Sequence, residues 1–176
     1  MDRLYVVAFP VLRAEDANHL EALRASHDAA GHARLKAHFT FVFGCAHTLY
    51  TAAEDAMRSA AATLDPIAFR LSQAVRSEHG GFHYVFLCPG PGAVAMRALH
   101  ERLHAGPLAA CLDPREPFTP HLTVCKTTQP AQAQEVFLRL HAKPPRIDGT
   151  LRALSLGAVR DDRFVVLSEA PLGGGR

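Results

Sequence analysis

Two short segments place a histidine and a threonine two residues apart inside apolar runs. The first, A-H-F-T-F-V-F, contains His38 and Thr40, and the second, P-H-L-T-V-C-K, contains His121 and Thr123. Residues i and i+2 of a strand point to the same face, about 6.6–7 Å apart, so each strand would present an imidazole beside a hydroxyl. Two such strands can form a pocket with two acid/base groups and two hydroxyl donors. The intervening apolar side chains would point into a core: Phe39, Phe41, Phe43, Leu122 and Val124.

These paired H-x-T-h segments (h, apolar), one in each half of the chain, resemble the motifs of the two-histidine (2H) phosphoesterase superfamily. The second segment, F-T-P-H-L-T-V-C-K, is especially similar to the branch of 2′-5′ RNA ligases and RNA 2′,3′-cyclic phosphodiesterases. The resemblance extends over the layout of nearly the whole chain. It implies an α+β fold in which two duplicated lobes carry mainly antiparallel sheets that face a central cleft, with helices outside.

The resemblance implies a phosphoesterase that hydrolyses 2′,3′-cyclic phosphate ends of RNA or nucleotides, or ligates through them, without a metal or other cofactor. One histidine, His38 or His121, would take a proton from water, and the other would protonate the departing ribose oxygen. Imidazole suits both roles because its ordinary pKa, about 6.5, lies near neutral pH. Thr40 and Thr123 would donate hydrogen bonds to the phosphate oxygens. The sequence does not assign the acid and base roles to particular histidines.

Lys126 is a candidate phosphate contact, because a basic residue often stands after the second motif in the RNA ligase branch. Under strict strand alternation its side chain points away from His121, so a twist or a bulge is required. The first motif has no basic residue at the corresponding place, and it has Ala37 where the branch usually has proline. Phosphate binding is therefore expected to depend more on the second motif.

Three aromatic residues are candidate stacking partners for a nucleobase: Phe9, Tyr84 and Phe86. For each of them a buried core position is the alternative interpretation. Arg76 and His83, near the expected cleft mouth, are further candidate phosphate contacts, with a solvated surface position as the alternative.

A competing motif lies at residues 100–104, where H-E-R-L-H matches the H-E-x-x-H pattern of zinc hydrolases. On a helix His100 and His104 would share a face and could bind zinc, with Glu101 as the base. Gly106-Pro107 ends the helix at once and no third ligand follows, so we place this interpretation last. A non-catalytic module that binds an RNA end or a nucleotide in the same pocket is the other alternative.

Composition favours one soluble domain. The chain has 176 residues, 48% of them apolar and 20% charged, and its net charge of +2 is too small for a non-specific nucleic-acid binder. The four cysteines form no C-x-x-C pair and are interpreted as free thiols in a reducing compartment. The apolar run near the N-terminus is too short for a signal peptide or membrane helix, so a cytoplasmic protein is expected. We also expect it to be a monomer.

The order of periodic segments is repeated along the chain. Strands are expected at 4–9, 38–43, 67–76, 82–88, 121–126, 147–159 and 163–169, and helices at 12–29, 49–63, 92–105 and 130–141. Equivalent segments lie roughly 80 residues apart, which indicates an internal duplication with repeats of about 1–78 and 79–170 in one bilobal domain. Residues 171–176 are expected to be a flexible tail.

Overall fold

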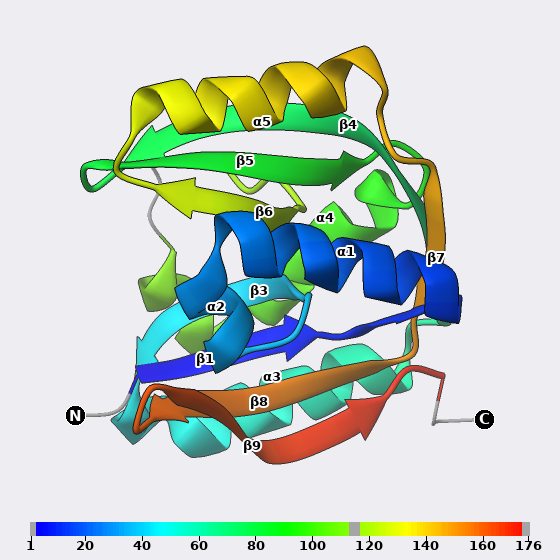
Figure 1. Cartoon of the computed structure of the whole chain (residues 1–176). Helices are drawn as coiled ribbons and strands as arrows, with labels where there is room; N and C mark the ends of the chain where they lie inside the picture. Colours follow the sequence, from blue (N-terminus) through cyan, green and yellow to red (C-terminus); the bar gives the residue numbers. More distant parts are fainter. Residues whose placement is uncertain (1–2, 113–116, 174–176) are drawn as a thin grey trace.

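A computed structural model describes residues 3–112 and 117–173, in which two antiparallel sheets lie one above the other in Figure 1. The first sheet has the order β3-β1-β8-β9, formed by β1 (Arg3–Ala8), β3 (Phe39–Ala46), β8 (Ala153–Arg160) and β9 (Arg163–Pro171). The second has the order β2-β7-β4-β5-β6, formed by β2 (Pro10–Leu12), β4 (Ile67–His79), β5 (Phe82–Pro89), β6 (Leu122–Thr127) and β7 (Ile147–Leu151). The fold is α+β, as the sequence predicts.

Helices with one apolar face cover the sheets. On α3 (Tyr50–Ala62) the buried residues Ala53, Met57 and Ala60 recur at helical spacing, and the helix packs on β8 and β9. The second sheet is covered by α5 (Pro130–Ala142), which contacts β4, β5 and β6. Short 3₁₀ helices lie at η1 (His47–Leu49) and η2 (Pro107–Cys111). Among the described residues, no helix has the length and apolarity needed to cross a membrane.

In each half of the chain, one helix packs against the sheet that carries the motif strand of the other half. From the first half, α1 (Ala14–His27) packs against β6, the edge strand of the second sheet, and α2 (Ala29–Arg34) follows it. From the second half, α4 (Ala93–Leu103) packs against β3, the edge strand of the first sheet. Each strand that follows a motif histidine is therefore supported by a helix from the opposite half of the chain.

Two of the expected segments differ in the structure. The helix expected at 12–29 is α1, which ends at His27. A second helix that was not predicted, α2, begins at Ala29, where the side chain of Asp28 accepts a hydrogen bond from Gly31 N (3.2 Å). The strand expected at 147–159 is two strands, β7 and β8. At Arg152, between them, the chain passes from the second sheet to the first. No glycine or proline marks that change, so the apolar pattern is continuous in the sequence. The short strand β2, at residues expected to end a strand and begin a helix, was not predicted.

The expectation that Phe43 is buried is wrong, since its side chain is 73% exposed. The register between β1 and β3 shifts twice. As a result the consecutive residues Phe41 and Val42 are both buried, and the alternation of buried and exposed side chains is displaced by one residue before Phe43. Three residues of the expected tail at 171–176 lie in the described part of the chain. Leu172 is buried, and Gly173 N donates to the carbonyl of Ala61 (3.1 Å). Residues 174–176 lie outside the described part of the chain.

The prediction that all four cysteines are free thiols is wrong for one pair. Cys45 on β3 and Cys111 at the end of η2 form a disulfide, with their Cα atoms 5.5 Å apart. Residues 66 positions apart in sequence meet because η2 packs against β3. Cys88 and Cys125 are free and buried, and burial raises the pKa of the Cys88 thiol to about 11. Sequence spacing alone contains no sign of the Cys45 pairing.

Candidate active site

The two motif histidines occupy matching positions, each one residue before an edge strand. His38 precedes β3 and His121 precedes β6, and both side chains are half-buried. The Nδ1–H group of His38 donates to the carbonyl oxygen of Lys36 (2.7 Å), and that of His121 donates to the carbonyl of Thr119 (2.7 Å). Because a carbonyl can only accept, Nδ1 carries the hydrogen in both rings. Nε2 is then the nitrogen that can accept or deliver a proton.

The histidines lie close enough for their charges to interact. Burial lowers the pKa of His38 to about 4; the hydrogen bond to the Lys36 carbonyl opposes this shift, and the positive charges of Arg24 and His121 reinforce it. Burial also lowers the pKa of His121, against the hydrogen bond to Thr119. Both rings are therefore neutral near pH 7 in the free protein. A bound phosphate would favour the protonated form of either ring through its negative charge.

A β-bulge follows each motif threonine. On β6, Thr123 pairs with Phe86 and Lys126 pairs with Tyr84, with a register shift between them, and the intervening Val124 and Cys125 are both buried. Since Tyr84 and Phe86 are two apart on β5 and share a face, Lys126 and Thr123 share a face as well. The bulge that the sequence analysis requires for Lys126 is present.

The first motif repeats this arrangement with a different side chain. Thr40 pairs with Val7, and the phase change on β3 turns Phe43 to the face that Thr40 shares. The ring of Phe43 meets Tyr5 edge to face, with centroids 5.3 Å apart. Phe43 therefore stands where the second motif has Lys126, 83 residues later, and the site has a cation on one side and an aromatic pair on the other.

Aromatic rings lie beside both histidines. Phe86 stacks on His121, with centroids 3.9 Å apart, and Tyr84 lies next to Phe86 at 5.6 Å. Phe9 approaches His38 at 6.5 Å. None of the three aromatic candidates is fully buried, so each keeps a face or an edge toward solvent. The ring in direct contact with a motif histidine is Phe86.

The family comparison gives a decisive match. The profile described as "2'-5' RNA ligase superfamily" matches residues 12–163, which is most of the chain.

The chain belongs to the 2′-5′ RNA ligase superfamily.

Solved structures agree with this membership at the level of fold. The structure of E. coli LigT in apo form is 16% identical in sequence to this chain, with a TM-score of 0.62. The alignment covers 97% of each chain. TT0787 of Thermus thermophilus shares 18% identity over 99% of this chain and 100% of its own, with a TM-score of 0.62. Kluyveromyces marxianus Usb1 shares 8% identity over 96% and 97% of the two chains, with a TM-score of 0.56. A search of curated proteins finds no match.

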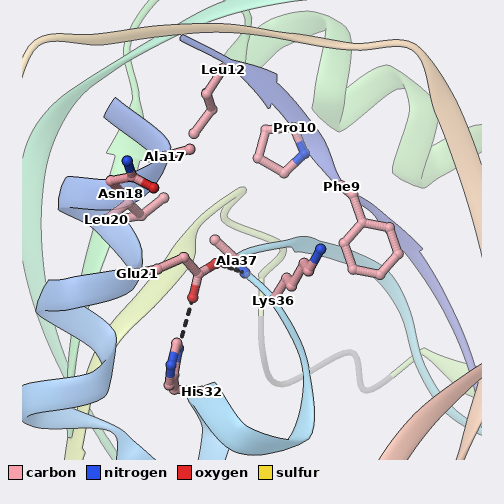
Figure 2. Close-up of a pocket in the computed structure, with 10 residues that line it drawn as sticks. All are labelled: Phe9, Pro10, Leu12, Ala17, Asn18, Leu20, Glu21, His32, Lys36 and Ala37. Carbon is pink, nitrogen blue, oxygen red and sulfur yellow. Dashed lines mark hydrogen bonds and ion pairs between the residues drawn. The ribbon is translucent and has the colours of Figure 1, made fainter. Parts of the chain in front are cut away.

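A pocket of about 610 Å³ opens next to the first motif of this superfamily member (Figure 2). Its apolar wall comes from the end of β1 through β2, and its other wall from α1, α2 and the loop before His38. The lining residues are Phe9, Pro10, Leu12, Ala17, Asn18, Leu20, Glu21, His32, Lys36 and Ala37. The pocket is open to solvent and is lined by apolar side chains together with Asn18, Glu21, His32 and Lys36.

Sequence reasoning missed the side chains that hold this loop. Glu21 on α1 accepts hydrogen bonds from Ala37 N (2.7 Å), His32 Nδ1 (2.8 Å) and Arg24 Nη1 (3.0 Å), and Figure 2 shows the first two. Arg24, only 2% exposed, also donates to the carbonyl of Leu35 (2.8 Å). Together they fix the loop whose Lys36 carbonyl orients His38. A Glu and an Arg three apart on a helix resemble an ordinary solvated pair, so no sequence signal distinguishes them.

Burial would raise the pKa of the Glu21 carboxyl, but the hydrogen bonds from Ala37 and His32 and the charges of Arg24 and His32 together lower it. The carboxylate is therefore ionised at neutral pH. It balances the buried guanidinium of Arg24.

The two histidines of the H-E-x-x-H segment, at the C-terminal end of α4, are engaged in packing. His100 stacks on Phe118 with ring centroids 3.9 Å apart, and His104, 6% exposed, donates from Nδ1 to the carbonyl of His100 (2.9 Å). Burial lowers the pKa of both rings, that of His100 to about 4. Within 3–112 and 117–173, no three His, Cys, Asp or Glu side chains are grouped to hold a metal ion.

Arg76 and His83 lie on the other face of the second sheet. Arg76 bonds Gln134 of α5, the helix that covers that face, and His83 lies between Phe82 and Tyr84 on β5 with its side chain opposite theirs. Neither is placed to contact a phosphate at the motif threonines.

Proposed function

We propose that this chain is a metal-independent phosphoesterase that opens 2′,3′-cyclic phosphate ends of RNA or nucleotides. The observation that carries the proposal is that each motif histidine donates from Nδ1 to a backbone carbonyl two residues before it. The Nε2 atom of each ring is therefore left for proton transfer. Superfamily membership supports phosphoester chemistry. E. coli LigT has been solved with 3′-AMP, ATP and phosphate, which supports a nucleotide phosphate as ligand of the shared fold.

In the proposed reaction Nε2 of one histidine takes a proton from water as the water oxygen bonds to phosphorus. The bond from phosphorus to one ribose oxygen breaks, and Nε2 of the other histidine protonates that oxygen. We assign the base role to His38, because burial and the charge of Arg24 hold its pKa at about 4 and keep it neutral. The pKa of His121 is lowered by burial alone, so this ring is the acid once the bound phosphate favours its protonation.

The threonine hydroxyls would stabilise the charge on the phosphate. The side chains of Thr40 and Thr123 are half-buried beside the histidines and can donate to the non-bridging oxygens. Hydrogen bonds to charged groups contribute about 1.5–3 kcal/mol each. Lys126 shares the face of Thr123, and its Nζ atom lies over the rings of Phe82 and Tyr84, so it adds a positive charge beside the site. In the ligation direction a hydroxyl of a second RNA end would attack the cyclic phosphate in place of water. The base would take the proton of that hydroxyl, and the acid would protonate the same departing ribose oxygen.

The test is turnover of a 2′,3′-cyclic phosphate by the purified protein and by His38→Ala and His121→Ala. Each variant should lose roughly 10²–10⁴-fold in kcat, the usual contribution of one acid or base. His141→Ala, at an exposed position on α5, is the matched control and should retain full activity. A 2′-phosphate product is expected, as the family resemblance implies. Tight nucleotide binding without turnover would instead indicate a non-catalytic module.

A further inference from the structure

A row of aromatic side chains runs along β5 from the second motif to the end of the sheet. Phe82, Tyr84 and Phe86 occupy alternate positions. Of the residues between and beyond them, His83 is partly buried, and Val85 and Leu87 are fully buried. The three rings therefore share the face opposite α5. Their centroids are 6.5 Å and then 5.6 Å apart, and the row ends on the imidazole of His121 at 3.9 Å.

A cation lies over the same row. The Nζ atom of Lys126 is 4.4 Å from the ring centroid of Phe82 and 5.7 Å from that of Tyr84. Phe82 is 36% exposed, and Val75, which pairs with Phe86 on the neighbouring strand, is 39% exposed. Partly exposed rings and a lysine ammonium thus form one continuous strip, which we call the β5 strip: Phe82, Tyr84, Phe86 and Lys126.

The first sheet has no equivalent strip in the part of the chain that the structure describes. The positions of β1 that correspond to the three rings are Arg3, Tyr5 and Val7, and Arg3 donates to the carbonyl of Gly44 (3.2 Å). The place of Lys126 is taken there by Phe43. Among the described residues, only the β5 side of the site therefore has both an unbroken row of rings and a lysine ammonium over them. A ligand longer than one nucleotide would therefore extend along β5.

The chemistry of the β5 strip matches single-stranded nucleic acid. Successive bases stack on aromatic side chains whatever their sequence, and a nearby cation attracts the backbone phosphates. The strip is continuous with the proposed reaction centre through the contact between Phe86 and His121. A folded protein partner would not require a row of rings that ends at a catalytic imidazole.

We propose that the β5 strip binds the two nucleotides that precede the reacting end of a single-stranded RNA. Phe86 holds His121, Tyr84 and Phe82 each stack on one base, and Lys126 contacts the phosphate between them. The enzyme would then act on RNA oligonucleotides in preference to free cyclic nucleotides. This inference rests on the proposed function, because it takes the cyclic phosphate at the histidines as the fixed point.

The experiment compares kcat/KM for adenosine substrates of one to four nucleotides, each with a 2′,3′-cyclic phosphate end. The second and third nucleotides should each raise kcat/KM on the order of tenfold, the effect of one stacked base, and the fourth should add little. Phe82→Leu and Tyr84→Leu keep apolar volume but remove the ring. The first should abolish the gain from the third nucleotide, and the second the gain from the second nucleotide. Leu138→Ala, at an exposed apolar position on α5, should leave the length dependence unchanged.

Equal kcat/KM for all lengths would overturn the proposal, and so would a loss in the Phe82 variant that is as large for the mononucleotide as for the trinucleotide. If no cyclic phosphate is turned over at all, the proposed function fails and the β5 strip is tested separately by binding. Fluorescence anisotropy should then show that a labelled adenosine trinucleotide binds more tightly than labelled AMP, with the difference lost in Phe82→Leu. Equal binding of the two probes would refute the strip as an RNA site.

Discussion

Replacing Glu21 with alanine should destabilise the fold and slow the reaction, although Glu21 is not expected to touch substrate. The carboxylate accepts from Ala37 N and Arg24, and each charge-assisted bond contributes about 1.5–3 kcal/mol. The bond to His32 adds little, because that side chain is 37% exposed. Because Glu21 itself is 28% exposed, we discount the sum for solvent screening and expect a loss of about 3 kcal/mol in the free energy of unfolding.

Urea unfolding followed by circular dichroism measures this loss, and turnover of a 2′,3′-cyclic phosphate measures its effect on the site. Because the loop before His38 is no longer held, kcat should fall about tenfold or more, the usual result of a misplaced catalytic group. Glu21→Gln keeps an oxygen that can accept from Ala37 N, so its kcat should stay close to wild type while part of the stability is lost. Glu21→Ala with wild-type stability and wild-type kcat would refute the positioning role.

The pH dependence of the unfolding free energy, compared between wild type and Glu21→Gln, is a second test of the role of Glu21. The folded-state pKa of Glu21 is lowered below the ordinary value of 4.5, so its ionised form stabilises the fold fully above that value. This contribution is lost as the pH falls through the folded-state pKa. The difference in unfolding free energy between wild type and Glu21→Gln should therefore be largest near neutral pH and should shrink at acidic pH.

Four further results are expected. Thr40→Val and Thr123→Val should each lower kcat about tenfold to a hundredfold through one lost charged hydrogen bond, measured by steady-state kinetics. The pH profile of kcat/KM should be bell-shaped, and Arg24→Gln should move its acidic limb to higher pH, because loss of that positive charge raises the pKa of His38. Activity should survive exhaustive chelation, whereas loss restored by zinc would favour the histidine pair of α4. Cys111→Ser should lower the free energy of unfolding in urea by about 4 kcal/mol, from loop closure over 66 residues.

The elements that carry strong periodicity were predictable from the sequence. The alternation in residues 67–76, the apolar run at 82–88 and the helical spacing in α3 give the right element types. The Gly80-Gly81 turn joins β4 and β5 with positive φ at both glycines, as a tight hairpin requires. The resemblance of the two H-x-T segments led to the correct superfamily. These features were predictable because they depend on residues close together in the chain.

The features that sequence reasoning missed depend on contacts between distant residues. The phase change that exposes Phe43 arises from the pairing of β3 with β1. The bond between Cys45 and Cys111 requires η2 to pack on β3, and the role of Arg24 appears only when α1 lies beside the loop at Leu35. In each case the residue type is compatible with several environments, and the tertiary structure selects one of them.

The strand order of the first sheet has a consequence for how the chain folds as it is synthesised. On one side β1 pairs with β3 early in the sequence, but on the other side Leu4 pairs with Ala158 in β8. One edge of β1 therefore remains unpaired until β8, about 150 residues further along the chain, has been synthesised. Such non-local pairing predicts slow folding and transient exposure of an apolar strand, because chain-closure entropy is lost before the contacts form. Deletions near the C-terminus should therefore cause aggregation through β1 rather than a local defect at β8 and β9.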